Sequence, residues 1–201
     1  MLKFNSDRAP EYQIETEIIQ ENGQLWVQKK PMTQAAQSTI EQIYDNYDVL
    51  KKVYYDVHLC SVKKTEKGLS FEYIYGETLR EKYENAISAR DKETFWHLID
   101  LHKDILRGNC ENVCNFHSTE EYEKIFGKGE AFESASALKV VNFEGTPQNI
   151  LFLENMVPAF IDYEWVFQFP VPWDLILYHC IIMPITFFRK ICPIPGCRTI
   201  P

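Results

Sequence analysis

The stretch Asn142-Phe-Glu-Gly-Thr-Pro-Gln-Asn149, followed by Phe160-Ile-Asp-Tyr-Glu164, decides the fold predicted for this chain. The first segment is a turn-forming loop between two short apolar segments, with Glu144 near its start and Asn149 at its end. A carboxylate followed five residues later by an amide has the spacing at which a loop places a base beside a hydroxyl group and a carbonyl oxygen on a metal ion. The first segment therefore predicts a catalytic loop.

The second segment ends in two acids, Asp162 and Glu164, directly after an apolar strand. A carboxylate at the end of a buried strand is costly unless a metal ion or hydrogen-bond donors meet it. Residues two apart on a strand point to the same side, and two acids there suit a hard cation such as Mg2+. The alternative interpretation is an aspartate that caps a turn beside a surface glutamate.

Length and charge restrict the class of protein. The chain has 201 residues and 45% hydrophobic residues, which predicts one globular domain or a small two-lobed one. Its formal net charge of −8 argues against a nucleic-acid partner or an anionic membrane surface. A local cluster of Lys and Arg could still hold a phosphate group.

The six cysteines predict no disulfide framework, because the N-terminus has no apolar signal segment. We therefore expect reduced thiols and a cytoplasmic protein. Cys110, Cys114 and His117 could in principle bind zinc, but a fourth ligand is missing, and ordinary half-buried thiols are the favoured interpretation. Residues 175–188 are apolar but shorter than the ~20 residues of a spanning helix, so we expect a buried core helix, with a membrane-associated helix as the alternative.

Hydrophobic periodicity predicts a strand-rich N-terminal lobe over residues 1–75. Asn22-Gly23 is a two-residue hairpin signal, and the recurrence of apolar residues predicts a helix over 33–53. The order is strand, strand, helix, strand, strand, and Gly76 ends the lobe. The predicted strands are residues 12–19, 24–30, 58–64 and 68–74.

The C-terminal lobe is predicted over residues 76–190 and has a different character. Helices are expected at 78–87 and 91–106, and 108–137 reads as a weak helix or a loop. Short strands are expected at 138–143, 149–153 and 157–161. An irregular tail, interpreted as an artefact of truncation or frame shift, is expected at 191–201 because its prolines exclude a helix.

A lysine on the second strand completes the set of candidate groups. Lys29 and Lys30 point to opposite faces of that strand, so only one of them can face a cleft between the lobes. Glu41 on the following helix could form an ion pair with that lysine. The alternative is that all three are solvated surface charges.

Taken together, these motifs resemble the protein-kinase-like fold, and more closely its aminoglycoside-phosphotransferase and small-molecule kinase branch. That branch carries a His-Gly-Asp-x-x-x-x-Asn loop, matched here by Asn142-Phe-Glu144 through Asn149, and a strand that ends in Ile-Asp-x-Glu, matched by residues 161–164. The resemblance covers nearly the whole chain. It implies an α+β fold with two lobes, an N-terminal antiparallel sheet plus one helix, and a mainly helical C-lobe that is truncated here.

The resemblance also implies roles for individual residues. Lys29 would hold the phosphates of ATP with Glu41 as its partner, and the backbone of a hinge formed by Glu72, Tyr73 and Ile74 would hold adenine. Glu144 would be the base, and Asp174 would brace the catalytic loop from below. Mg2+ would be bound by Asn149 and Asp162, with Glu164 assisting.

The sequence departs from the family pattern at four places. Glu144 replaces Asp, and Asn142 and Phe143 replace His and Gly. The N-terminal hairpin has no glycine-rich phosphate loop, which leaves Ser6, Arg8 and the backbone of residues 6–12 as alternative cover for the phosphates. Few residues follow the metal-binding strand for the helices of a full C-lobe.

The predicted function is therefore an ATP- and Mg2+-dependent phosphotransferase that acts on a small-molecule or glycan hydroxyl. The motifs most resemble those of kinase-like domains in bacterial surface-polysaccharide enzymes. This resemblance implies a methyltransferase or glycosyltransferase module as a partner. The alternative is a pseudokinase-like module that binds nucleotide or a partner without efficient catalysis. A third possibility is an acidic globular domain whose motifs are accidental.

Overall fold

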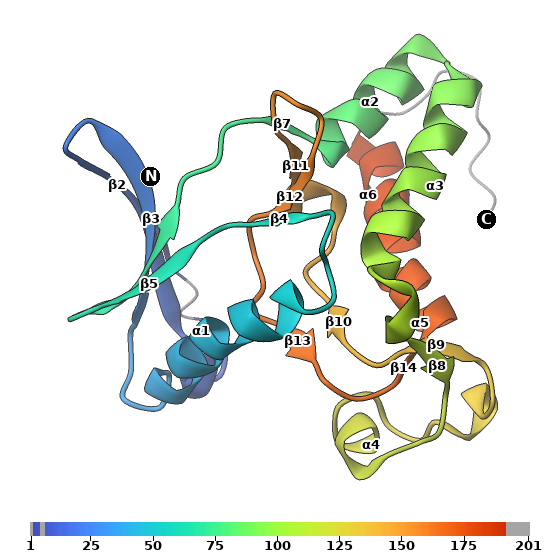
Figure 1. The fold of residues 1–201 in the computed structure, drawn as a ribbon, viewed down its shortest axis with the longest axis horizontal. Helices are drawn as coiled ribbons and strands as arrows, with labels where there is room; N and C mark the ends of the chain where they lie inside the picture. The colour runs from blue at the N-terminus through green and yellow to red at the C-terminus, as the bar shows by residue number, and fades with distance from the viewer. Residues whose placement is uncertain (1, 5–6, 192–201) are drawn as a thin grey trace.

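The computed structural model describes residues 2–4 and 7–191 of the chain. It has a mixed α+β architecture, which confirms the predicted class. An antiparallel sheet with one helix forms one side of the molecule, and a group of helices forms the other (Figure 1). Short strands lie between the two.

The N-terminal sheet is built around the predicted hairpin. β2 (Ile14–Glu21) and β3 (Gln24–Pro31) pair antiparallel through Asn22 and Gly23, whose φ angles of 52° and 81° are those that a tight hairpin turn requires. The sheet has five strands in the order β1-β2-β3-β6-β5. The remaining strands are β1 (Leu2–Phe4), β5 (Val62–Thr65) and β6 (Gly68–Glu72).

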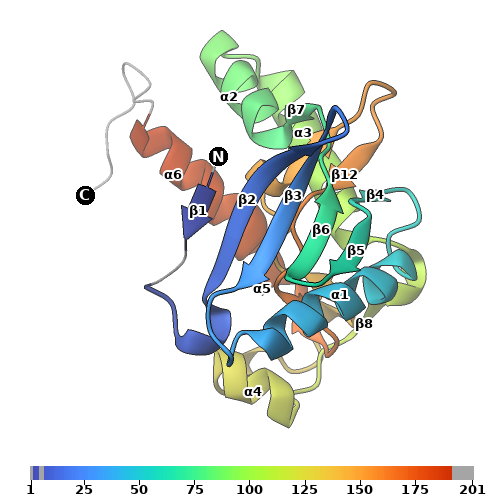
Figure 2. The same ribbon diagram turned by 90° about the vertical axis from the view of Figure 1, so that its left-hand side faces the viewer.

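One helix, α1 (Gln37–Lys51), crosses the lower part of this sheet (Figure 2). It buries Ile40, Ile43 and Leu50, which belong to the main hydrophobic core. The helix begins later than predicted because the Thr33 side chain accepts a hydrogen bond from the backbone N–H of Ala36 at 3.1 Å and forms a turn before the helix.

The prediction of one strand over 58–64 is wrong, because the structure has two separate strands there, β4 and β5. β4 (His58–Leu59) leaves the N-terminal sheet and pairs in parallel with β12 (Pro158–Phe160). The resulting four-stranded sheet has the order β4-β12-β11-β7, with β11 (Ile150–Phe152) and β7 (Glu77–Thr78). It connects the two sides of the molecule through backbone hydrogen bonds.

Gly76 lies at the junction between the two sides. A Cβ atom at this position would lie 2.3 Å from the carbonyl oxygen of Phe152 on β11, so only glycine allows the chain to pass this close. The two helices that follow are α2 (Leu79–Ala89) and α3 (Lys92–Arg107), close to the predicted bounds. A capping box between Thr78 and Glu81 fixes the start of α2.

The stretch 108–137 is more structured than predicted. It contains α4 (Glu120–Phe126) and two strands, and it packs on a small aromatic cluster around Phe116 and Tyr122. β8 and β9 of this stretch form a sheet with the later strand β14, in the order β14-β9-β8, and two further short strands, β10 and β13, pair with each other. Their bounds are Val113–Asn115 for β8, Ser136–Leu138 for β9, Val141–Asn142 for β10, Val166–Phe167 for β13 and Val171–Pro172 for β14.

The C-terminal helical segment consists of α5 (Trp173–Leu177), a π turn (Tyr178–Ile182) and α6 (Met183–Ile191). The wide π turn precedes Pro184, which cannot donate the usual helical hydrogen bond. The expectation of a buried core helix is only half right, since Ile176, Cys180 and Ile181 are buried whereas Tyr178, Ile182 and Phe187 are exposed. The segment buries one face only.

None of the helices in residues 2–4 and 7–191 is long and apolar enough to cross a membrane. α6 runs to residue 191, where the irregular tail was expected to begin. The rest of that predicted tail, residues 192–201, lies outside the described residues.

Candidate functional site

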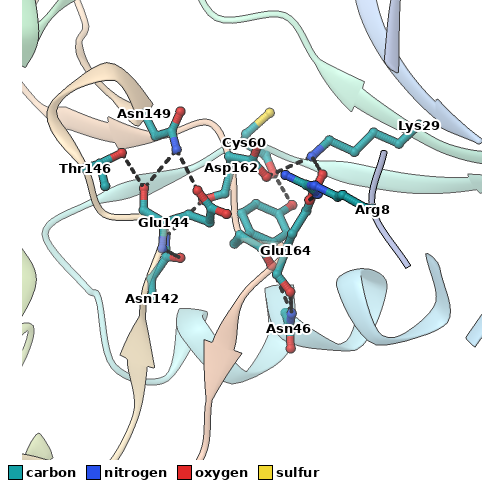
Figure 3. Close-up of polar contacts among 11 residues, drawn as sticks. Arg8, Lys29, Asn46, Cys60, Asn142, Glu144, Thr146, Asn149, Asp162 and Glu164 are labelled. Carbon is teal, nitrogen blue, oxygen red and sulfur yellow. Dashed lines mark hydrogen bonds and ion pairs between the residues drawn. The ribbon is translucent and has the colours of Figure 1, made fainter. Parts of the chain in front are cut away.

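The two strand-end acids meet the lysine of β3. The Nζ atom of Lys29 lies 2.8 Å from Oδ1 of Asp162 and 2.7 Å from Oε1 of Glu164 (Figure 3). The neighbouring lysine, Lys30, points to the other face and pairs with Glu17. The structure therefore brings Lys29 into one cluster with Asp162 and Glu164, which follow it in the sequence by 133 and 135 positions.

Lys29 is almost fully buried, with 5% of its surface exposed. Burial opposes its charge, but the carboxylates of Asp162 and Glu164 outweigh that effect and raise the pKa of Lys29. The pKa of Glu164 is lowered, because Lys29 and Arg8 together outweigh its own burial. The three groups thus form a charged network at neutral pH.

Arg8 is the second cation of this network. Its Nη1 atom lies 3.1 Å from Oε2 of Glu164, so Glu164 lies between two positive groups. Ser6, the other residue expected to cover the phosphates, lies outside the described residues. Beside Arg8 and Glu164 is a cavity of about 300 Å3, whose lining also includes Tyr12 and Trp165.

The 142–149 loop is tied to the strand end that carries Asp162 through Asn142. This side chain is fully buried, and its amide nitrogen donates to the backbone oxygen of Asp162 at 3.1 Å. Its amide oxygen accepts the backbone N–H of Glu144 at 3.2 Å. Asn142 therefore connects the two halves of the site, at the position where the kinase-like family has histidine.

Glu144 and Asn149 face each other across this loop. The Asn149 amide nitrogen donates to the Glu144 backbone oxygen at 3.0 Å and to its carboxylate at 3.1 Å. Burial, together with the negative charges of Asp162 and Glu164, raises the pKa of Glu144 to about 7. A carboxylate with a pKa near the working pH has the property expected of a general base.

His102 on α3 supports the loop from beneath, and no role was predicted for it. Its Nε2 atom lies 2.8 Å from the carbonyl oxygen of Gly145, and its Nδ1 atom lies 3.3 Å from the Tyr83 hydroxyl. Burial lowers the pKa of His102 to about 4, so the ring is neutral at pH 7 and Nε2 carries the proton that it donates to Gly145. The only sequence signal was a histidine on the apolar face of a predicted helix.

Asp174, by contrast, does not brace the loop. It is exposed on α5, and among the described residues it makes no hydrogen bond to the 142–149 loop. Phe143, which replaces the glycine of the family pattern, instead anchors the loop to the C-terminal helical segment. Its ring stacks on that of His179 with a centroid distance of 3.8 Å.

Glu41 does not pair with Lys29. It is exposed on α1, and within the described ranges the carboxylate partners of Lys29 are Asp162 and Glu164. α1 instead presents the buried Asn46, whose amide nitrogen donates to the backbone oxygen of Tyr163 at 2.9 Å. Five residues on a helix correspond to about 140° of rotation, so Glu41 and Asn46 cannot both face the site.

The expected hinge is partly committed to other contacts. The backbone N–H of Glu72 donates to Ser61 at 2.9 Å, and its backbone oxygen accepts the Cys60 thiol at 2.8 Å. That leaves Tyr73 and Ile74 as candidate adenine contacts. Ile74 is buried in the core, whereas Tyr73 lines a hollow of about 450 Å3 beside the first residues of β3 and the last residue of β6.

The described residues contain no group of three or more His, Cys, Asp or Glu side chains that could hold a metal ion. Cys110 and His117 are exposed, and His117 pairs with Glu133 rather than with the cysteines. The zinc alternative therefore has no support. Mg2+ needs only one or two carboxylates from the protein. Asp162 and Glu164 are carboxylates that meet at one point of the structure, where both pair with Lys29.

Comparison of the chain with protein-family models and with curated proteins finds no match. The functional argument therefore depends on the geometry of the site.

Proposed function

We propose that this protein is an ATP- and Mg2+-dependent phosphotransferase with a protein-kinase-like, two-lobed fold, acting on a hydroxyl group of a small molecule or glycan. The observation that carries the proposal is the contact of Lys29, from the N-terminal sheet, with Asp162, at the end of a C-terminal strand, at 2.8 Å. Phosphoryl transfer needs a cation for the phosphates and oxygen ligands for a metal ion, and these two residues provide one of each.

Each remaining group has a chemical role in this proposal. Lys29 binds the phosphates of ATP, and Asn149 and Asp162 hold Mg2+ with help from Glu164. The metal ion, when bound, supplies positive charge that balances the charge on the phosphates. Glu144 accepts the proton of the acceptor hydroxyl, a role supported by its raised pKa of about 7 and by its contact with Asn149.

The wider setting is also part of the proposal. A net charge of −8 favours a small-molecule or glycan acceptor over nucleic acid. A cytoplasmic location, with reduced thiols, is part of the proposal. A methyltransferase or glycosyltransferase module is the proposed partner.

Nucleotide binding and turnover test the proposal directly. We expect ATP with Mg2+ to raise the melting temperature of the wild type, and we expect ATP hydrolysis or transfer to be measurable. Asp162→Asn removes one metal-binding charge and should lower kcat by about 100-fold or more. Glu66→Gln, an exposed substitution in the β5–β6 turn, is the control that should behave as wild type. A wild type that neither binds nor turns over nucleotide would refute the proposal.

The second candidate is a pseudokinase-like binding module, and the replacement of the family's Asp by Glu144 favours it. One extra methylene shifts the carboxylate by about an ångström, which can cost about 100-fold in rate. Glu144→Asp separates the two candidates. A rate that rises in this variant indicates a weakened enzyme, whereas nucleotide binding without turnover in both forms indicates the module.

A further inference from the structure

The short segment that precedes β2 is firmly attached to the rest of the fold. It contains a single 3-10 turn, Pro10–Tyr12. The backbone oxygen of Pro10 accepts the Thr33 hydroxyl at 2.6 Å, and that of Glu11 accepts the Thr39 hydroxyl at 2.6 Å. The Tyr12 ring also packs on Trp165, with a centroid distance of 4.8 Å. Contacts to three other parts of the chain therefore hold the segment in place.

These attachments place Arg8 at the edge of the charged network. Its backbone oxygen accepts a hydrogen bond from the Gln13 side chain at 2.8 Å, which fixes the residue relative to the start of β2. Its guanidinium reaches Glu164, while 38% of the side chain remains exposed. Arg8 and Glu164 also line the same cavity of about 300 Å3, so a ligand can reach the guanidinium from solvent.

The two cations and two acids of the network balance in charge without any ligand. Lys29 and Arg8 carry two positive charges, and Asp162 and Glu164 carry two negative charges. If the acids are to serve a metal ion, both cations lose their carboxylate partners. Each then needs a new anion, because a partly buried charge without a partner is costly. The phosphates of a nucleotide supply such an anion.

We propose that Arg8 is a phosphate-binding residue, which contacts Glu164 in the nucleotide-free protein and turns to the phosphates of ATP when Glu164 serves the metal ion. This inference rests on the proposed function. It assigns to one arginine the task that a glycine-rich loop performs elsewhere in the resembled family. Arginine suits this task because its planar guanidinium can donate two parallel hydrogen bonds to phosphate oxygens.

The role of Arg8 in the reaction is electrostatic. The bond between the γ-phosphorus and the β,γ-bridging oxygen breaks, and ADP leaves with that oxygen. A new bond forms between the phosphorus and the acceptor oxygen, and the acceptor's proton passes to Glu144. Arg8 stabilises the negative charge on the transferred group and exchanges no atoms or electrons with it.

The proposal predicts effects of opposite sign on metal and nucleotide. Arg8→Gln removes a cation that competes for Glu164, so Mn2+ without nucleotide, followed by electron paramagnetic resonance, should bind roughly two- to fivefold more tightly. The same variant should lose about 100-fold in kcat for ATP turnover, with a roughly tenfold increase in the KM for ATP. Arg8→Lys keeps the charge and should recover part of kcat.

The control is Arg80→Gln, which removes an arginine from an exposed ion pair with Glu84 on α2. It should change neither metal affinity nor turnover. Circular dichroism and the melting temperature check that each variant is folded, and a merely structural Arg8 would weaken metal and nucleotide binding together. A wild type that turns over ATP beside an Arg8→Gln variant with unchanged kinetics would overturn this inference alone. A wild type that does not bind ATP would overturn the proposed function as well.

Discussion

At the scale of single residues, Glu144 has the most informative environment. Its side chain is half-buried, and Asp162 and Glu164 add negative charge nearby. Its pKa is about 7 in the folded protein, compared with 4.5 for an ordinary glutamate. Between these two pH values the folded state binds more protons than the unfolded state, so this group makes the protein less stable as the pH rises from 4.5 to 7.

Glu144→Gln should therefore stabilise the protein at high pH. A shift of this size corresponds to about 3 kcal/mol when the carboxylate is fully ionised, and glutamine can still accept the hydrogen bond from Asn149. We expect a gain of up to about 3 kcal/mol at pH 8 and almost none at pH 4, measured by urea unfolding in a chelator. The same variant should lose about 100-fold or more in turnover. A stability gain that does not depend on pH would contradict this assignment, and Glu66→Gln provides the control.

At the scale of elements, α3 supports the 142–149 loop through His102. The folded pKa of His102 is about 4, below the ordinary value of 6.5, so the ring is neutral in the fold. Between pH 4 and 6.5 the unfolded state binds more protons, and this group therefore makes the protein more stable as the pH rises. The effect of His102 on stability therefore opposes that of Glu144 over nearly the same pH range.

This opposition gives a second prediction. His102→Leu removes the donor to the Gly145 carbonyl and should cost about 1–3 kcal/mol at pH 7. His102→Gln keeps a donor at the position of Nε2 but does not titrate. As the pH rises from 4.5 to 6.5, the stability of His102→Gln should fall more steeply than that of the wild type, because the stabilising slope of His102 is lost. Urea unfolding across this range measures both effects.

Turnover separates a positioning role of His102 from a purely structural one. His102→Gln should keep most of kcat because the loop is still held, and His102→Leu should lose kcat more than it changes the KM for ATP. Equal losses in both variants, or a fall in stability with unchanged kcat, would contradict the positioning role.

Elements fixed by local signals were predictable from the sequence. The Asn22-Gly23 hairpin and the helices after Thr78 and Asp91 depend on turn and capping chemistry within a few residues. Contacts between distant segments were not. The parallel pairing of β4 with β12 and the choice of Asn46 over Glu41 depend on how the sheet and α1 pack. Within the candidate site, the sequence pattern indicated Lys29 and Asp162 as site residues, but only the fold shows that His102 contacts the 142–149 loop.

At the scale of the whole molecule, the two sides share one core. The main cluster of buried residues includes Ile43 from α1, Phe71 from β6 and Phe160 from β12. β4 joins the two sides by backbone pairing, and Gly76 passes against Phe152. The two sides of the molecule should unfold together, because neither can lose its structure without exposing the buried face of the other.

Calorimetry should therefore show one transition, with equal van't Hoff and calorimetric enthalpies. Gly76→Ala tests the junction, because the added methyl group would lie 2.3 Å from the Phe152 carbonyl oxygen and force the backbone apart. It should lower stability by roughly 1–3 kcal/mol while the transition stays single. Tryptophan fluorescence and far-ultraviolet circular dichroism should give the same midpoint, since Trp26 lies in the N-terminal sheet and Trp173 in α5. Two separate transitions would contradict this prediction and would mean that the two sides of the molecule are thermodynamically independent.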